Sequence, residues 1–242
     1  MRALMLMIAM SMCSCQPKDD GHLALDDARR LAGQGDYEGA LAKHVWFHDN
    51  ALTVRSSYYG VRLSFALSAW VELGKKYPKA LEKLSSIRDE KTSRLLSGEA
   101  KKELFHDVES INQHLGETKS TVELFKRIEA VDPDFAGRIY DIASEALLQA
   151  REYALAKKYL GDPTNRLATA KRNLEEGMAF VKTGKNGDAT RRAFESIFTD
   201  EVVRLITLLK ETDENAGARN IQTEALKTLD SDAIRNAIEL KP

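Results

Sequence analysis

Hydrophobic residues recur at intervals of three and four positions along most of the chain after residue 21. One such stripe contains Leu63, Leu67 and Trp70, and another contains Leu104 and Val108. Side chains at these intervals lie on one face of an α-helix, whereas strands would show strict alternation. The chain has only 5 prolines and 14 glycines in 242 residues, which favours long helices joined by short turns. The pattern therefore predicts an all-α protein.

A short motif recurs four times between residues 35 and 156. In its clearest copy, Gly-Asp-Tyr at 35–37 is followed by a small residue, and related copies stand near 74–80, 116–121 and 151–156. A small residue early in the second helix of a hairpin lets the first helix approach closely, and the glycine permits the turn. Each copy predicts one helical hairpin. Aligned on their small residues, the copies are 40, 41 and 35 residues apart: Ala40, Ala80, Thr121 and Ala156.

This repeat resembles the tetratricopeptide repeat family over residues 23–163. The shortest spacing is close to that family's unit of about 34 residues. The sequence departs from the family pattern at Phe47, where a small residue is usual, and at Arg151, where the turn glycine is missing. The resemblance implies an α-solenoid of stacked antiparallel helical hairpins, in which each hairpin buries its apolar face against its neighbours.

Residues 164–242 show a weaker pattern, which we interpret as further hairpins and a cap of the same solenoid. A helix is expected over 166–181 and another over 189–198. A separate helix is expected to carry the apolar residues between Val202 and Leu209. The next helix is expected over 216–229, and Ser231 is expected to precede a short terminal one.

The first fifteen residues follow a different pattern. Arg2 is followed by an apolar run that reaches Met12, and Cys13, Ser14 and Cys15 precede a polar stretch. A run of about ten apolar residues is too short to span a bilayer, which needs about 20. It suits the apolar region of a secretory signal peptide.

With the small Ser14 before Cys15, this segment resembles the lipobox of bacterial lipoproteins. The resemblance implies that residues 1–14 are a signal peptide and that Cys15 receives a diacylglycerol and a fatty acyl chain such as palmitate. Residues 15–22 would be the linker to this anchor. The chain would then lie in the bacterial cell envelope, attached to the membrane through its lipid only. The alternatives are ordinary secretion, which would leave a periplasmic or secreted protein, and an unprocessed N-terminus.

Charge and candidate chemistry narrow the classes of function. The 36 Lys and Arg residues nearly balance 37 Asp and Glu residues, whereas a nucleic-acid-binding protein normally concentrates basic charge. His44 and His48 have the four-residue spacing of a metal pair, but Val45 stands where a metalloprotease needs glutamate. We interpret the two histidines as packed within their hairpin. With no recognisable nucleophile, metal site or cofactor motif, the sequence does not predict an enzyme.

A binding surface follows from the repeat, because the resemblance implies that the first helix of each hairpin lines a concave face. A protein or peptide partner bound there would make the chain a membrane-tethered scaffold for protein–protein interaction. The alternative is an accessory protein that binds a small ligand there, such as a peptide or a peptidoglycan fragment. A large apolar patch favours the first function and a deep polar pocket the second. The residues expected on this face are Arg62, Phe65, Glu72, His106, Gln113, Arg138, Asp141 and Glu145.

Overall fold

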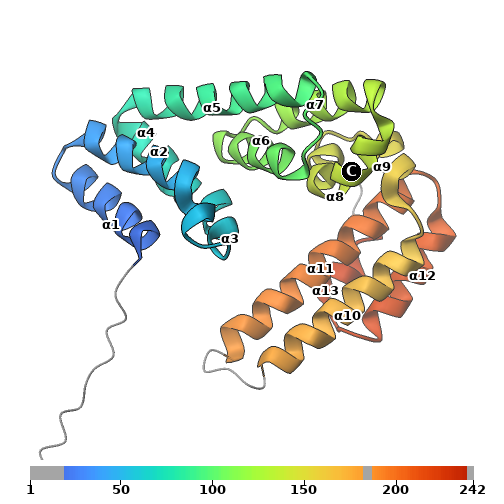
Figure 1. Cartoon of the computed structure of the whole chain (residues 1–242). Helices are drawn as coiled ribbons and strands as arrows, with labels where there is room; N and C mark the ends of the chain where they lie inside the picture. Colours follow the sequence, from blue (N-terminus) through green and yellow to red (C-terminus); the bar gives the residue numbers. More distant parts are fainter. Residues whose placement is uncertain (1–18, 182–186, 239–242) are drawn as a thin grey trace, which may run out of the picture. The chain divides into compact units, whose positions relative to one another are not determined.

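The computed structural model describes residues 19–181 and 187–238, and the regular elements among them are all α-helices (Figure 1). This confirms the predicted all-α class. The expected signal peptide and Cys15 lie outside the described residues. The helices in chain order are α1 (Asp20–Gly33), α2 (Tyr37–Val54), α3 (Tyr58–Leu63), α4 (Phe65–Lys76), α5 (Pro78–Leu96), α6 (Lys102–Leu115), α7 (Thr118–Val131), α8 (Pro133–Gln149), α9 (Tyr153–Leu160), α10 (Pro163–Val181), α11 (Gly187–Glu211), α12 (Asn215–Leu226) and α13 (Asp232–Asn236).

The chain divides into two compact units, residues 1–86 and 87–242, and the division falls within α5. Across the described parts of both units, none of the helices combines the length and apolar character that crossing a membrane requires.

The N-terminal unit is built around the packing of α1 against α2. Gly35 makes the turn between them with a left-handed φ of 83°. Asp36 then caps α2, because its carboxylate accepts a hydrogen bond of 2.9 Å from the Gly39 N–H. Phe47, Tyr58 and neighbouring alanines fill the core of this unit.

The small residues that align the repeat are all buried. Ala40, Ala80, Thr121 and Ala156 are each at most 2% exposed. At Ala80 the backbone carbonyl also accepts a 2.9 Å hydrogen bond from the Trp70 indole N–H. The sequence prediction that these positions lie at close helix contacts agrees with their burial.

The repeat glycines do not share one role, which corrects the sequence interpretation. Gly35 and Gly116 adopt left-handed φ values of 83° and 74°, as a turn glycine should. Gly74 instead lies inside α4, where an added Cβ would stand 2.3 Å from Leu81 Cγ. Gly74 therefore lets the Leu81 side chain approach α4 closely. At the fourth copy, Arg151 adopts a left-handed φ of 60° although it is not glycine.

The C-terminal unit has a continuous apolar core that draws on α5 to α13. Within it α7 packs on α8, and α11 packs on both α10 and α12. The two helices expected over 189–198 and 202–209 form a single helix, α11. The intervening Thr199, Asp200 and Glu201 include no proline or glycine that would end a helix. In Figure 1, α10 and α11 run antiparallel beside each other, and this pair positions the site described next.

Candidate functional site

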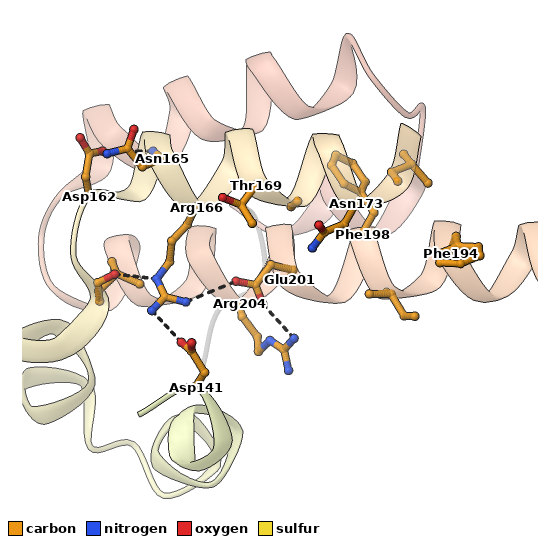
Figure 2. Close-up of a pocket in the computed structure, with 14 residues that line it drawn as sticks. Asp141, Asp162, Asn165, Arg166, Thr169, Asn173, Phe194, Phe198, Glu201 and Arg204 are labelled. Carbon is orange, nitrogen blue, oxygen red and sulfur yellow. Dashed lines mark hydrogen bonds and ion pairs between the residues drawn. The ribbon is translucent and has the colours of Figure 1, made fainter. Parts of the chain in front are cut away.

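A pocket of the C-terminal unit lies where α10 and α11 meet Asp141 on the exposed side of α8. It has a volume of about 430 Å³, which is within the range of roughly 300–1,000 Å³ for sites that bind small molecules. Figure 2 shows its charged side chains at one end and the phenylalanines at the other. We call it the α10–α11 pocket.

Helical periodicity explains how α10 supplies one wall. Asn165, Thr169 and Asn173 follow each other at intervals of four residues, so they form a line along one face of the helix. Asp162 fixes the start of this helix by accepting a 2.7 Å hydrogen bond from the Thr164 N–H. This line of side chains is therefore polar and uncharged, and Arg166, Ala170 and Leu174 of the same helix line the pocket beside it.

Five charged side chains form an alternating series, which we call the ion ladder. Four of them line one end of the pocket, and the fifth, Glu145, lines an adjoining hollow. Arg166 lies 2.7 Å from the Asp141 carboxylate and 3.9 Å from Glu201. Arg204 lies 2.9 Å from the other Glu201 oxygen and 3.4 Å from Glu145. The ladder thus joins α8, α10 and α11 through Asp141, Arg166, Glu201, Arg204 and Glu145.

Further contacts hold Arg166 in place. The Arg166 Nε donates a 2.6 Å hydrogen bond to the Leu160 carbonyl, and its guanidinium lies 5.2 Å from the centre of the Tyr140 ring. Burial raises the pKa of Tyr140 to about 12, so its ring stays neutral beneath the cation. The Arg204 Nε is buried and has no hydrogen-bond partner within the described part of the chain.

The opposite end of the pocket is apolar. Phe198 is buried, Phe194 is half-buried and Ile197 is exposed. Gly177 allows this arrangement, because an added Cβ would stand 2.4 Å from the Phe194 ring. A ligand here would meet aromatic and aliphatic surface within reach of the ion ladder.

A second group of polar residues lies beside the ladder, between α6 and α8. Glu109, Gln113 and Glu145 line a cavity of about 20 Å³ there, which is room for about one water molecule. Burial raises the pKa of Glu109 to about 7; a hydrogen bond from the Ser110 hydroxyl opposes this rise and the charge of Glu145 adds to it.

In the C-terminal unit, several residues predicted for the concave face lie near one another. Asp141 lines the α10–α11 pocket, and Glu145 lines an adjoining hollow that shares Ile197 and Arg204 with it. Gln113 is exposed at the small cavity, His106 is half-buried on α6, and Arg138 is exposed with its guanidinium 5.1 Å from the Phe135 ring.

In the N-terminal unit, Phe65 and Glu72 are exposed and line a separate hollow of about 480 Å³. Arg62 does not share that surface, which corrects its expected position. It is 4% exposed, and its Nη1 lies 3.4 Å from Nε2 of the buried His48. The packing of α3 against α2 turns this arginine inward, so its place in the repeat pattern was misleading.

The histidine pair is packed as the sequence interpretation proposed. His44 and His48 are both buried against Trp70, with ring centroids 5.6 Å and 6.1 Å from the indole. Among residues 19–181 and 187–238, no three His, Cys, Asp or Glu side chains gather closely enough to hold a metal ion.

Sequence reasoning missed the residues that α10 and α11 contribute. Arg166, Glu201 and Arg204 are charges on helices outside the recognised repeat, where they looked like ordinary solvated positions. The four-residue spacing of Asn165 and Thr169 was a usable signal, because it continues to residue 173 on one helix face.

No model of a known protein family matches the chain, and no curated protein matches it either.

Proposed function

We propose that this chain is a protein-interaction module of the bacterial cell envelope, tethered by a lipid on Cys15, that binds a segment of a partner protein in the α10–α11 pocket. The observation that carries the proposal is the pairing, in one pocket, of an apolar wall around Phe194 and Ile197 with the ion ladder. Energetically important residues at protein interfaces are enriched in Trp, Tyr and Arg and lie in well-packed pockets from which water is excluded. The tetratricopeptide-like solenoid belongs to this proposal and is supported by the burial of the four repeat-aligning small residues.

A second candidate function has support from the size of the same pocket. About 430 Å³ is enough for a small ligand, such as a free peptide or a peptidoglycan fragment. The two candidates differ in whether a partner protein contacts the pocket in the cell.

Photo-crosslinking in living cells tests the first candidate. A photo-crosslinking amino acid in place of Asn173, which lines the pocket, should capture a discrete partner protein. The same amino acid in place of Ala168, which is exposed and does not line the pocket, should not capture it.

A pocket-filling substitution completes this test. Thr169→Trp in the Asn173 crosslinking protein should abolish capture, because the indole would occupy the pocket, whereas Ala168→Trp should preserve it. Exposed substitutions of this kind usually change stability by about 0.5 kcal/mol or less. Capture from position 168 alone would contradict the proposed docking site. Absence of any captured protein from position 173 would favour the small-ligand function.

The anchor is tested separately. Cys15→Ser should prevent incorporation of labelled palmitate and release the protein from the membrane fraction, whereas Cys13→Ser should change neither. Stable anchoring needs more than one acyl chain, which a diacylglycerol on Cys15 would supply. Retention of unlabelled Cys15→Ser protein in the membrane fraction would contradict the lipid anchor.

A further inference from the structure

The charge at the rim of the α10–α11 pocket indicates which ligand it suits. Of the ladder's side chains, the carboxylates Asp141 and Glu145 are the most exposed, at 64% and 53%. The side chains of Arg166 and Arg204 are less exposed, at 27% and 34%. A ligand that reaches this end therefore meets carboxylates first.

The ladder also carries a net negative charge. It contains three carboxylates, from Asp141, Glu145 and Glu201, and two guanidiniums, so their charges sum to −1. Both guanidiniums are already bound on two sides by carboxylates. An incoming anion would have to displace one of these contacts, whereas a cation would add to the existing alternation.

The line of polar side chains on α10 suits an extended peptide. Asn165, Thr169 and Asn173 are four residues apart, and a helix rises about 1.5 Å per residue, so neighbouring members are about 6 Å apart. An extended chain repeats its backbone groups on one side every two residues, or about 6.6 Å. Amide and hydroxyl side chains can both donate and accept hydrogen bonds, so this line matches the main chain of a bound segment.

Resting on the proposed function, we infer that the α10–α11 pocket binds an extended peptide segment with a basic side chain at the ion ladder and an aromatic or aliphatic side chain at Phe194 and Ile197. The line from Asn165 to Asn173 covers about 12 Å, which corresponds to a spacing of about four residues in an extended chain. Both anchoring side chains then project from the same side of the peptide, because residues separated by an even number share a side.

Short labelled peptides test this ligand class with the full-length protein in detergent. The basic probe is acetyl-Lys-Ser-Ala-Ser-Phe-amide, and its counterparts place Glu instead of Lys or Ala instead of Phe. Each sequence is also made in reverse, since the direction of the chain is open. By fluorescence polarisation, the basic probe in one direction should bind at least about five-fold more tightly than either counterpart. Its affinity should fall as salt is raised.

Variants link this preference to the named residues. Asp141→Asn combined with Glu145→Gln should weaken binding of the basic probe about five-fold and leave the Glu probe unchanged or improved. The matched control neutralises two exposed carboxylates that belong neither to the pocket nor to the ion ladder, Asp134→Asn with Glu175→Gln, and should preserve affinity. Thr169→Trp should abolish binding of every probe.

The outcomes separate this inference from the proposed function. Equal binding of basic and acidic probes, lost in Thr169→Trp, would overturn the ligand class while the pocket remained a peptide site. Tighter binding of the acidic probe would overturn it in the same way. If no probe binds at millimolar concentration but Asn173 still crosslinks a partner, the ligand class is wrong and the docking site stands. If both experiments fail, the proposed function fails with it.

Discussion

Each unit of the molecule contains a titratable side chain whose pKa is shifted by burial, and the two shifts have opposite directions. In the N-terminal unit, His44 is 5% exposed against Trp70, and burial lowers its pKa to about 4. In the C-terminal unit, burial raises the pKa of Glu109 to about 7, against the Ser110 hydroxyl and with the repulsion of Glu145. The physical cause is the same, because loss of water disfavours the charged form of either group.

The opposite directions of these pKa shifts predict opposite responses of the two units to pH. An unfolded histidine titrates near 6.5 and an unfolded glutamate near 4.5. His44 therefore contributes stability above about pH 6.5 that is lost as the pH falls toward 4, because the unfolded chain takes up the proton first. Glu109 contributes stability below about pH 4.5 that is lost as the pH rises through 7, because the folded chain holds its proton longer.

The chain offers a way to follow the units separately. Both of its tryptophans, Trp46 and Trp70, belong to the N-terminal unit. Tryptophan fluorescence therefore reports unfolding of that unit, whereas far-UV circular dichroism reports helices of both. Measuring the two signals in one titration tests the comparison without dividing the chain.

The largest expected effect is the acid sensitivity of the N-terminal unit. Between pH 7.5 and 4.5, its free energy of unfolding should fall by about 2–3 kcal/mol through His44, since each pKa unit corresponds to about 1.36 kcal/mol. Urea unfolding followed by tryptophan fluorescence at the two pH values measures this loss. In His44→Gln the loss should shrink, because glutamine does not titrate.

His114→Gln is the control for that experiment. His114 lies on α6 of the C-terminal unit, where it contacts the Ser110 carbonyl at 2.8 Å. Its replacement should leave the acid-induced loss in the fluorescence transition at its original size. A pH dependence that survives intact in His44→Gln would show that the comparison has assigned acid sensitivity to the wrong residue.

Glu109 gives the next effect, with the opposite sign. Glu109→Gln should stabilise the protein by about 2 kcal/mol at pH 8.5, a value reduced from the full shift because the side chain is only half-buried. At pH 4.5 most of the gain should disappear, because the glutamate is then protonated in the folded chain and half-protonated in the unfolded chain. Thermal unfolding followed by circular dichroism at both pH values measures the difference.

Glu103→Gln, an exposed position on the same helix, should show no such dependence on pH. Equal gains for Glu109→Gln at pH 4.5 and 8.5 would mean that glutamine simply packs better. The predicted pH response of the C-terminal unit would then be wrong.

Two buried residues of the N-terminal unit, His44 and Arg62, show what periodicity could predict. The sequence placed His44 within a packed hairpin correctly, because its neighbours in the pattern determine that face of α2. Arg62 fits the pattern of an exposed position equally well, yet contact with His48 turns it inward. That contact joins residues fourteen apart, so only the packing of α3 on α2 reveals it.

The same limit applies to glycines and to the candidate site. One residue type supplies a turn at Gly116 and a close packing contact at Gly74, and spacing alone does not distinguish them. The α10–α11 pocket depends on Arg166 and Glu201 meeting across two helices. Each looks like a solvated charge on its own helix, so their partnership arises from tertiary packing.

The smallest expected effect comes from the backbone conformation of Arg151 in the C-terminal unit. Unlike the effects of His44 and Glu109, it should not depend on pH. Arg151 ends α8 in the backbone conformation that glycine adopts after α1 and α6. The hydrogen bonds agree: the Arg151 N–H donates to the Leu148 carbonyl at 3.0 Å and the Glu152 N–H to Leu147 at 2.8 Å. The N–H groups of Gly116 and Glu117 bond to Gln113 and Asn112 in the same pattern, which is the usual left-handed end of a helix.

Arg151→Gly should therefore stabilise the C-terminal unit. A left-handed φ costs an L-residue roughly 1–2 kcal/mol, and the greater freedom of glycine in the unfolded chain offsets part of that gain. The net increase should be about 0.5–1 kcal/mol, or roughly 2 °C in the melting temperature followed by circular dichroism.

Gly116→Ala, the reverse change at the equivalent turn, should lower the melting temperature by a similar amount. Because φ does not titrate, the gain should be the same at pH 5 and pH 8.5, unlike the effect of Glu109→Gln. A lower melting temperature for Arg151→Gly would mean that the arginine side chain contributes more through its contacts than its backbone conformation costs.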